Sequence, residues 1–218
     1  MRAMPTHPDH HRHADEAAEV AEWNERYRDR DQIWSGRPNS ALVAEVAGVA
    51  PGRALDVGCG EGADAVWLAQ RGWAVTAIEV ADVALDRGRA AAAEAGVDIT
   101  WRHAGLVDAA LPGGGFDLVS VQYPALRTRP DHATERALLD AVAPGGTLLF
   151  VTHADMDAER AKAHGFDPAD YVGTDDVIAA LDSGWEVVVD EERARRVASG
   201  RGADHHLDRV VRIRRDRG

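Results

Sequence analysis

ALDVGCGEGADAVWLAQRGWAVTAIEV, residues 54–80, carries the strongest structural signal in this chain. It opens with a short apolar segment and passes through three alternate glycines, Gly58, Gly60 and Gly62. An alanine-rich segment with helical spacing follows, and a second apolar segment ends at Glu79. This order predicts a strand, a glycine turn, a helix and a second, parallel strand. The turn after the first strand of such a unit commonly holds a ligand.

The same alternation continues through the rest of the chain. Apolar, β-rich runs occupy residues 53–57, 73–79, 98–102, 116–122, 147–153, 185–191 and 207–215. Helical stretches lie between most of them, at residues 63–71, 82–95, 131–142 and 175–181. Alternating strands and helices predict an α/β fold with a doubly wound, mainly parallel, seven-stranded sheet. Only a loop separates the last two runs, so we expect an antiparallel edge strand.

Composition narrows the class of partner. The chain has 218 residues, 45% of them hydrophobic and 28% charged, and a formal net charge of −12. We expect small-molecule partners and no nucleic acid, because this net charge repels phosphate backbones. No apolar run approaches the roughly 20 residues of a membrane span, so no membrane partner is expected. A single cysteine, Cys59, and the lack of a secretory leader favour the cytoplasm. No particular oligomeric state is predicted.

The N-terminal residues 1–20 are polar and histidine-rich. Their HPDHHRH tract lacks a spaced carboxylate or cysteine that would complete a metal site. We therefore predict a disordered tail and no metal.

The ligand of the glycine turn has two candidate classes. Gly58, Gly60 and Ala63 satisfy the dinucleotide pattern G-x-G-x-x-[GA], which favours an NAD(P)-dependent oxidoreductase. Asp56, two residues before the first glycine, would face a pyrophosphate with like charge, but it suits a ligand with an ammonium group and a sulfonium. Glu79 can accept hydrogen bonds from ribose hydroxyls in either case. The chain is also short for an oxidoreductase with a separate substrate domain.

ALDVGCGEG, followed by VTAIEV and by LLDAVAPGGTLLFV, resembles the class I S-adenosylmethionine-dependent methyltransferases. The resemblance implies a Rossmann-like methyltransferase domain over residues 53–218, with S-adenosylmethionine as cofactor and S-adenosylhomocysteine as product. Upstream, WNERYRDRDQIWSGRPNSALV resembles the N-terminal segment of small-molecule members of the tellurite-resistance and thiopurine methyltransferase type. Residues 21–52 would then form a helical lid over the donor.

The resemblance also implies roles for single residues. Asp56, Gly58 and Gly60 would surround the methionine end of the donor, and Glu79 would bind the ribose. Many relatives place an acid after the third strand to bind the adenine amino group, but this chain has Gly105 there. The remaining donor contacts are then expected from Trp34 in the lid, Val80, Gly105 and Leu106 at the adenine, and Val121 at the ammonium group.

The acceptor is expected to be a small thiol, a metalloid or a natural-product intermediate. SVQYPAL lacks the Asn/Asp-Pro-Pro-aromatic signature of enzymes that methylate nucleobases or glutamine. A soft nucleophile needs only orientation and desolvation for in-line displacement at the methyl group, whereas a hydroxyl or ammonium acceptor needs a base. Tyr123 and His153 are the candidate catalytic residues, and residues 154–173 are expected to shape the acceptor pocket. A donor-binding protein that uses S-adenosylmethionine for other chemistry stays open, because the acid is missing at Gly105.

Overall fold

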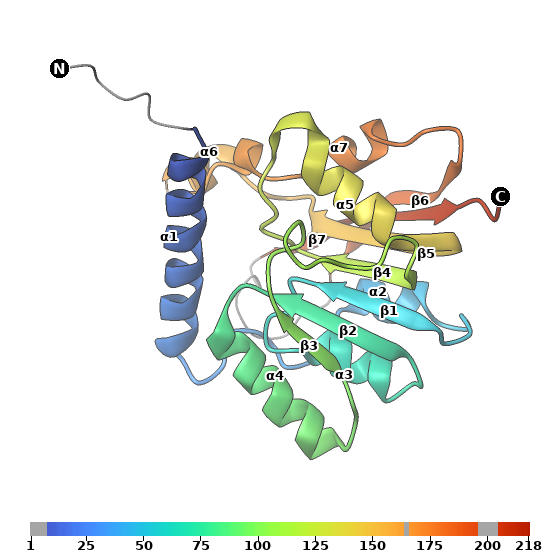
Figure 1. The fold of residues 1–218 in the computed structure, drawn as a ribbon, viewed down its shortest axis with the longest axis horizontal. Helices are drawn as coiled ribbons and strands as arrows, with labels where there is room; N and C mark the ends of the chain where they lie inside the picture. Colours follow the sequence, from blue (N-terminus) through green and yellow to red (C-terminus); the bar gives the residue numbers. More distant parts are fainter. Residues whose placement is uncertain (1–7, 164–165, 196–204) are drawn as a thin grey trace.

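The computed structural model describes residues 8–163, 166–195 and 205–218. Its core is one seven-stranded sheet in the order β3-β2-β1-β4-β5-β7-β6 (Figure 1). β1 to β5 run parallel to one another, while β7 pairs antiparallel with both β5 and β6. The doubly wound, mainly parallel sheet with an antiparallel edge strand is therefore confirmed. The strands are β1 (Arg53–Val57), β2 (Ala74–Glu79), β3 (Thr100–His103), β4 (Phe116–Gln122), β5 (Val142–His153), β6 (Trp185–Ala194) and β7 (Leu207–Arg215).

Helices cover both faces of the sheet. On one face, Leu138 and Val177 pack with strand residues such as Val119 and Phe150 in the larger core cluster. On the other face, Leu42 and Leu68 belong to a second cluster. The first face carries α5 (Ala133–Ala141) and α7 (Thr174–Ala179), and the second carries α2 (Ser40–Glu45), α3 (Ala63–Ala69) and α4 (Asp82–Ala95); α6 (Ala158–Ala163) lies in the connection after β5.

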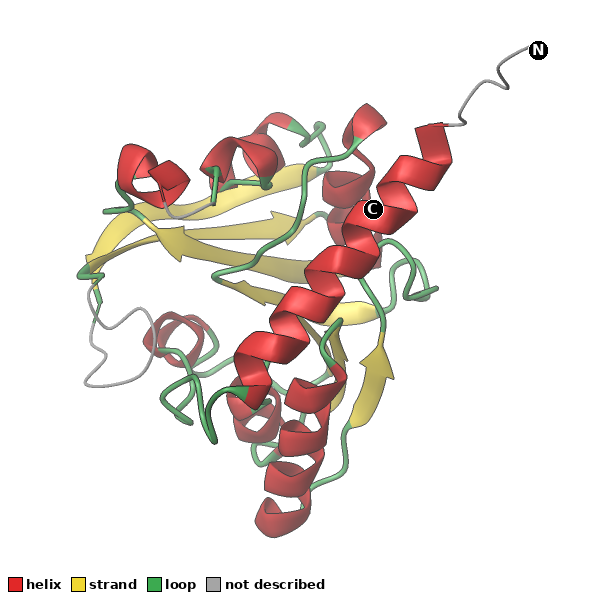
Figure 2. Ribbon diagram, turned by 90° about the vertical axis from the view of Figure 1, so that its left-hand side faces the viewer, coloured by secondary structure: helices red, strands yellow, loops and turns green. Residues whose placement is uncertain are grey.

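The N-terminal helix α1 (Pro8–Arg28) corrects the prediction of a disordered tail up to residue 20. Proline fits the first turn of a helix, where its missing N–H is not needed. No glycine or further proline interrupts the alanine- and glutamate-rich sequence after Pro8. Figures 1 and 2 show α1 crossing the edge of the sheet where the parallel strands end. Residues 1–7 of the predicted tail lie outside the described part.

β5 begins at Val142, five residues earlier than predicted, because the PGG segment belongs to the strand. Val142 pairs with Phe116, and the register shifts before regular pairing resumes at Thr147 and Leu118. A side chain at Gly146 would lie 2.9 Å from the carbonyl oxygens of Ala143 and Phe116. Glycine is therefore required by close backbone approach at this irregular point.

No helix in the described part of the chain combines the length and the apolar character that a membrane span needs.

Candidate functional site

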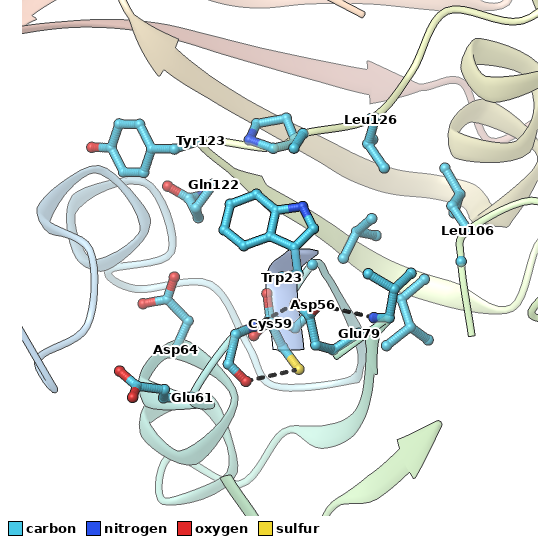
Figure 3. A pocket seen from close by; sticks show the side chains of 18 of the residues that line it. Trp23, Asp56, Cys59, Glu61, Asp64, Glu79, Leu106, Gln122, Tyr123 and Leu126 are labelled. Carbon is cyan, nitrogen blue, oxygen red and sulfur yellow. Dashed lines mark hydrogen bonds between the residues drawn. The ribbon is translucent and has the colours of Figure 1, made fainter. Parts of the chain in front are cut away.

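A cavity of about 530 Å³ lies at the carboxyl ends of β1, β2 and β4 (Figure 3). The sheet order reverses between β1 and β4, which is where α/β sheets bind their ligands. Strand ends and the glycine turn line one side of the cavity, and α1, the segment around Trp34 and the loop after β4 line the others. Of the predicted donor residues, the lining includes Trp34, Asp56, Gly58, Gly60, Glu79, Val80, Gly105 and Leu106.

The glycine turn has the backbone conformation that its sequence predicts. Gly58 and Gly60 have φ angles of 66° and 52°, in the left-handed region that favours glycine. A side chain at Gly60 would come within 3.1 Å of both the Trp34 indole nitrogen and the Tyr27 hydroxyl. At Gly58, no described atom lies within 4 Å of the added carbon. The turn therefore packs tightly against Trp34 and Tyr27 at Gly60, whereas space remains open at Gly58.

Glu79 holds this turn in place. Its carboxylate accepts hydrogen bonds from the backbone amides of Gly60 at 3.0 Å, Val80 at 2.8 Å and Ala81 at 3.0 Å. Burial raises the pKa of Glu79, and these three amides act in the opposite direction. Oε1 accepts two of the bonds and Oε2 only one, so Oε2 keeps capacity for a further donor.

Asp56 is 2% exposed, and its Oδ2 has no hydrogen-bond partner among the described residues. Burial raises the pKa of this carboxyl well above its ordinary value, and the neighbouring Asp64 and Glu79 raise it further. A buried carboxylate without a cation is costly, so the site favours a positively charged ligand at this point.

Two further carboxylates hold residues 33–39 against the glycine turn. Glu61 accepts from the backbone amides of Ile33 and Trp34 and pairs with Arg87 at 2.7 Å. Asp64 accepts from both the backbone and side-chain nitrogens of Asn39, each at 2.7 Å. The Trp34 indole in turn donates to the Tyr27 hydroxyl at 2.9 Å.

The predicted adenine end contains an acid that sequence spacing did not indicate. Asp108 lines the cavity, and its Oδ2 lies 3.6 Å from the point where a Gly105 side chain would begin. The turn in which the Asp108 amide donates to the Gly105 carbonyl brings the two residues together. Val121, by contrast, is fully buried and absent from the lining, while Gln122 faces the cavity.

Tyr123 lines the cavity at the end of β4 with a φ of 51°, which is unusual for a residue other than glycine. Its hydroxyl donates to Asp208 Oδ2 at 2.7 Å. Burial, together with this hydrogen bond, raises the pKa of Tyr123 above its usual range. The phenol is therefore fully protonated at neutral pH.

His153 does not line the cavity; its ring stacks on Tyr123 with the centroids 4.4 Å apart. Burial lowers the pKa of His153, which keeps the ring neutral. This predicted base therefore lies next to Tyr123 and away from the cavity. In the sheet, β5 is one strand further than β4 from β1, which leads into the glycine turn. Residues 154–173 were expected to shape the acceptor pocket. None of the described residues in that range lines this cavity, whereas residues of α1 and of the loop after β4 do.

His153, Asp155 and His205 bring three potential metal-ligand atoms within 4.8 Å of one another. The two imidazole rings stack at 3.9 Å with an angle of 11° between their planes. A metal must lie close to the plane of each ligating ring, and one ion cannot lie in two nearly parallel planes. The rings would have to rotate before this cluster could bind a metal.

The middle of the chain is similar to a known protein family. Residues 54–146 match the family model of a methyltransferase domain. This part of the chain is therefore similar to a methyltransferase domain. An uncharacterized methyltransferase of Mycobacterium tuberculosis is 39% identical over 124 residues, which are 56% of this chain and 61% of that relative. The chain thus spans less than two thirds of this relative's length.

Two solved structures extend the similarity of this domain to nearly the whole chain. One, described with the conversion of a disulfide bond into a thioacetal group during echinomycin biosynthesis, has a TM-score of 0.72 and 26% identity and covers 92% of this chain and 93% of its own. The other is the N-methyltransferase NodS of Bradyrhizobium japonicum in complex with S-adenosyl-L-homocysteine. It has a TM-score of 0.64 and 21% identity, with 90% of this chain and 98% of its own covered.

The sequence did not indicate several residues that complete the lining of the cavity. The sequence did not predict Asp108 as a cavity residue, because a turn, and not the spacing after β3, brings it to the site. Arg195 was hidden because it follows β6, far from the motifs in sequence. Glu61 and Asp64 stand beside the glycines in the motif. Nothing in the sequence indicated that they would accept hydrogen bonds from the backbone of residues 33–39.

Proposed function

We propose that the protein transfers a methyl group from S-adenosylmethionine to a small-molecule acceptor by in-line displacement. The acceptor's lone pair forms the new bond to the methyl carbon, the carbon–sulfur bond breaks, and S-adenosylhomocysteine leaves. The observation that carries this proposal is the buried, unpartnered Asp56 oxygen beside a glycine turn that opens into the cavity. An orphaned buried carboxylate fits a donor that brings an ammonium group and a sulfonium.

The residues present fit the donor from end to end. Asp56, Gly58 and Gly60 would hold the methionine end, with the β4 carbonyls of Val121 and Gln122 nearby. Oε2 of Glu79 can accept from a ribose hydroxyl in addition to the Gly60 amide. Val80, Leu106 and the Gly105 backbone would contact the adenine, and Asp108 would accept from its amino group. Residues 21–52 would close over the donor through Trp34.

The acceptor side favours a nucleophile that needs no protein base. No histidine lines the cavity within the described ranges, and Tyr123 gives its proton to a hydrogen bond with Asp208. A thiolate, a metalloid oxyanion or a sulfur-bearing natural product reacts once it is oriented and desolvated. The neighbour connected with echinomycin biosynthesis supports the natural-product class. The tellurite-resistance and thiopurine-type subtype remains a prediction.

Neither alternative is favoured. A pyrophosphate would meet the Asp56 carboxylate, which opposes a nicotinamide dinucleotide. Asp108 supplies a carboxylate beside Gly105, which weakens the argument for a protein that binds the donor without transferring its methyl group.

Isothermal titration calorimetry with S-adenosylmethionine, S-adenosylhomocysteine and NADH tests the proposal. We expect micromolar dissociation constants for the first two and no heat from NADH. Asp56→Asn should weaken donor binding by about tenfold, since one charge-assisted contact is lost. Binding of NADH without binding of S-adenosylmethionine would contradict the methyltransferase function.

A further inference from the structure

Acidic and basic side chains line different parts of the cavity. Asp56 and Glu79 lie beside the glycine turn, whereas Arg37, Arg127, Arg129 and Arg195 line the parts formed by the lid, the loop after β4 and the end of β6. Figure 3 shows Tyr123 and Gln122 in its upper left part, with Asp64 and Glu61 below them. Arg127 is neutralised by Glu19 of α1 at 2.7 Å.

Arg195 differs from Arg127 in its partners. Its Nη1 donates to the His153 ring, 2.9 Å from Nδ1 and 3.2 Å from Nε2. No carboxylate oxygen of a described residue lies within ion-pair distance of its guanidinium, and its buried Nε has no hydrogen-bond partner in the same part of the chain. A guanidinium keeps its charge at any ordinary pH, so among the described residues this cation has no paired carboxylate beside the cavity.

The side chains around Arg195 are fixed by contacts from other strand ends. The Arg195 guanidinium carbon lies 4.3 Å from the Tyr123 ring centroid. Tyr123 is held by its bond to the buried Asp208 and by stacking on His153. Its left-handed backbone conformation is a strained feature of the kind that clusters at ligand sites. Residues from three other strand segments thus surround this cation.

We propose that the methyl acceptor is an anionic small molecule whose carboxylate, or a similarly shaped oxyanion, binds Arg195. This inference rests on the proposed function, because it concerns the acceptor of that reaction. With Nη1 bound to His153, the guanidinium still offers the edge formed by Nε and Nη2, which matches the two oxygens of a carboxylate. The anion would supply the partner that the buried Nε lacks, and it would hold the nucleophile toward the donor end of the cavity.

The test uses the full chain saturated with S-adenosylhomocysteine and two matched pairs of probes. The pairs are 2-mercaptobenzoate with its methyl ester, and 3-mercaptopropionate with its amide. Calorimetry should show each anion binding roughly tenfold to a hundredfold more tightly than its neutral partner, as expected for a charge-assisted pair. Methyl transfer from S-adenosylmethionine to the same probes, followed as S-adenosylhomocysteine formed, should show the same preference in kcat/KM.

Arg195→Gln should abolish the preference for the anion. Arg195→Lys should keep part of it, because lysine keeps the positive charge but cannot donate two parallel hydrogen bonds to a carboxylate. Arg214→Gln is the matched control: it removes an exposed arginine of the neighbouring strand and should leave the preference unchanged. The comparison of probes on the unaltered protein does not depend on how well any variant folds.

Equal binding of the anion and its neutral partner, binding of neither, or an unchanged preference in Arg195→Gln would each overturn the inference while leaving donor binding intact. Failure of S-adenosylhomocysteine to bind in the first titration would instead overturn the proposed function, and this inference with it.

Discussion

At the scale of single residues, Glu79 serves the protein before any ligand is present. Its carboxylate accepts three backbone amides and so links the end of β2 to the glycine turn after β1. Donor binding and the shape of the turn therefore depend on the same side chain.

Glu79→Ala should weaken donor binding by roughly tenfold to a hundredfold, because charge-assisted hydrogen bonds are worth about 1.5–3 kcal/mol. It should also lower the melting temperature, since three amides lose their acceptor. Glu79→Gln should fall between, because one oxygen remains but an NH₂ group would face one of the amides. Calorimetry and thermal melts measure the two effects separately.

A donor analogue without the ribose 2′-hydroxyl provides the control for Glu79. It should bind the unaltered protein more weakly and lose less further affinity in Glu79→Ala, where the partner is already gone. Unchanged donor binding by a folded Glu79→Ala would mean that Glu79 does not contact the ribose.

Asp56 predicts opposite pH dependences for stability and for donor binding. Burial, followed by the nearby Asp64 and Glu79, raises its pKa in the folded protein well above the ordinary value of an aspartate. Ionised Asp56 therefore opposes folding, and its contribution to the free energy of unfolding should improve as pH falls through the raised pKa. A cationic donor favours the ionised form, so donor affinity should decrease over the same pH range.

Urea denaturation and calorimetry between about pH 5 and pH 8 measure both trends. Asp56→Asn should flatten both relative to the unaltered protein, because the amide does not titrate. Parallel pH profiles in the two proteins would show that other groups cause them.

Part of the site could be predicted from sequence because local spacing determines it. Asp56, Gly58, Gly60 and Glu79 follow from two strand ends and one turn, and each lines the cavity. Asp108 and Arg195 depend on how loops fold back in three dimensions, and no short-range pattern encodes that. His153 ends β5 as predicted, but it stacks on Tyr123 and does not line the cavity, and the sequence does not show which side chain lies next to it.

At the scale of elements, α1 and α4 each supply hydrogen-bond partners for free backbone groups at one end of the other helix. The buried side chain of Asn24 accepts from the Val83 amide in the first turn of α4, where α4 has no side-chain cap of its own. In return, Arg87 of α4 donates to the carbonyls of Tyr27 and Arg30 at the end of α1. Free amides and carbonyls at helix ends need such partners, so the two helices stabilise each other.

Asn24→Ala should destabilise the docking of α1 by about 1–2 kcal/mol, as loss of a helix cap does. Amide exchange over residues 17–39 should become faster, and donor binding should weaken. Added donor should slow exchange over the same segment in the unaltered protein. Arg89→Ala, which removes an exposed arginine of α4, is the control and should change none of these measurements.

If exchange over residues 17–39 were the same with and without bound donor, this segment would be a packed part of the fold and not a lid.

Elements were predictable wherever apolar periodicity was strong. β1, β4, β7 and α4 begin and end where the pattern indicates. α1 was missed over residues 8–20 because a polar, histidine-rich composition gives little apolar periodicity, although nothing in it breaks a helix. The start of β5 was missed because PGG normally marks a turn, whereas here the glycines accommodate a close backbone approach within the strand.

At the scale of the whole molecule, the net charge does not show how acidic and basic side chains are distributed around the cavity. A net charge of −12 describes an acidic protein. The cavity nevertheless has buried carboxylates beside the glycine turn and arginines on its other walls. This separation suits a cationic donor and an anionic acceptor in one space, and it arises only when β1, β2, β4 and β6 are brought to the same edge of the sheet.

The distribution of tryptophan gives the molecule an optical reporter of its own. Of six tryptophans, Trp23 and Trp34 line the cavity, while Trp67, Trp73, Trp101 and Trp185 are absent from its lining. A ligand that displaces water from those two indoles should change their fluorescence emission without any attached dye. Trp34→Phe should remove much of the change and Trp185→Phe should preserve it, so that donor occupancy could be followed in real time at the concentrations used for turnover.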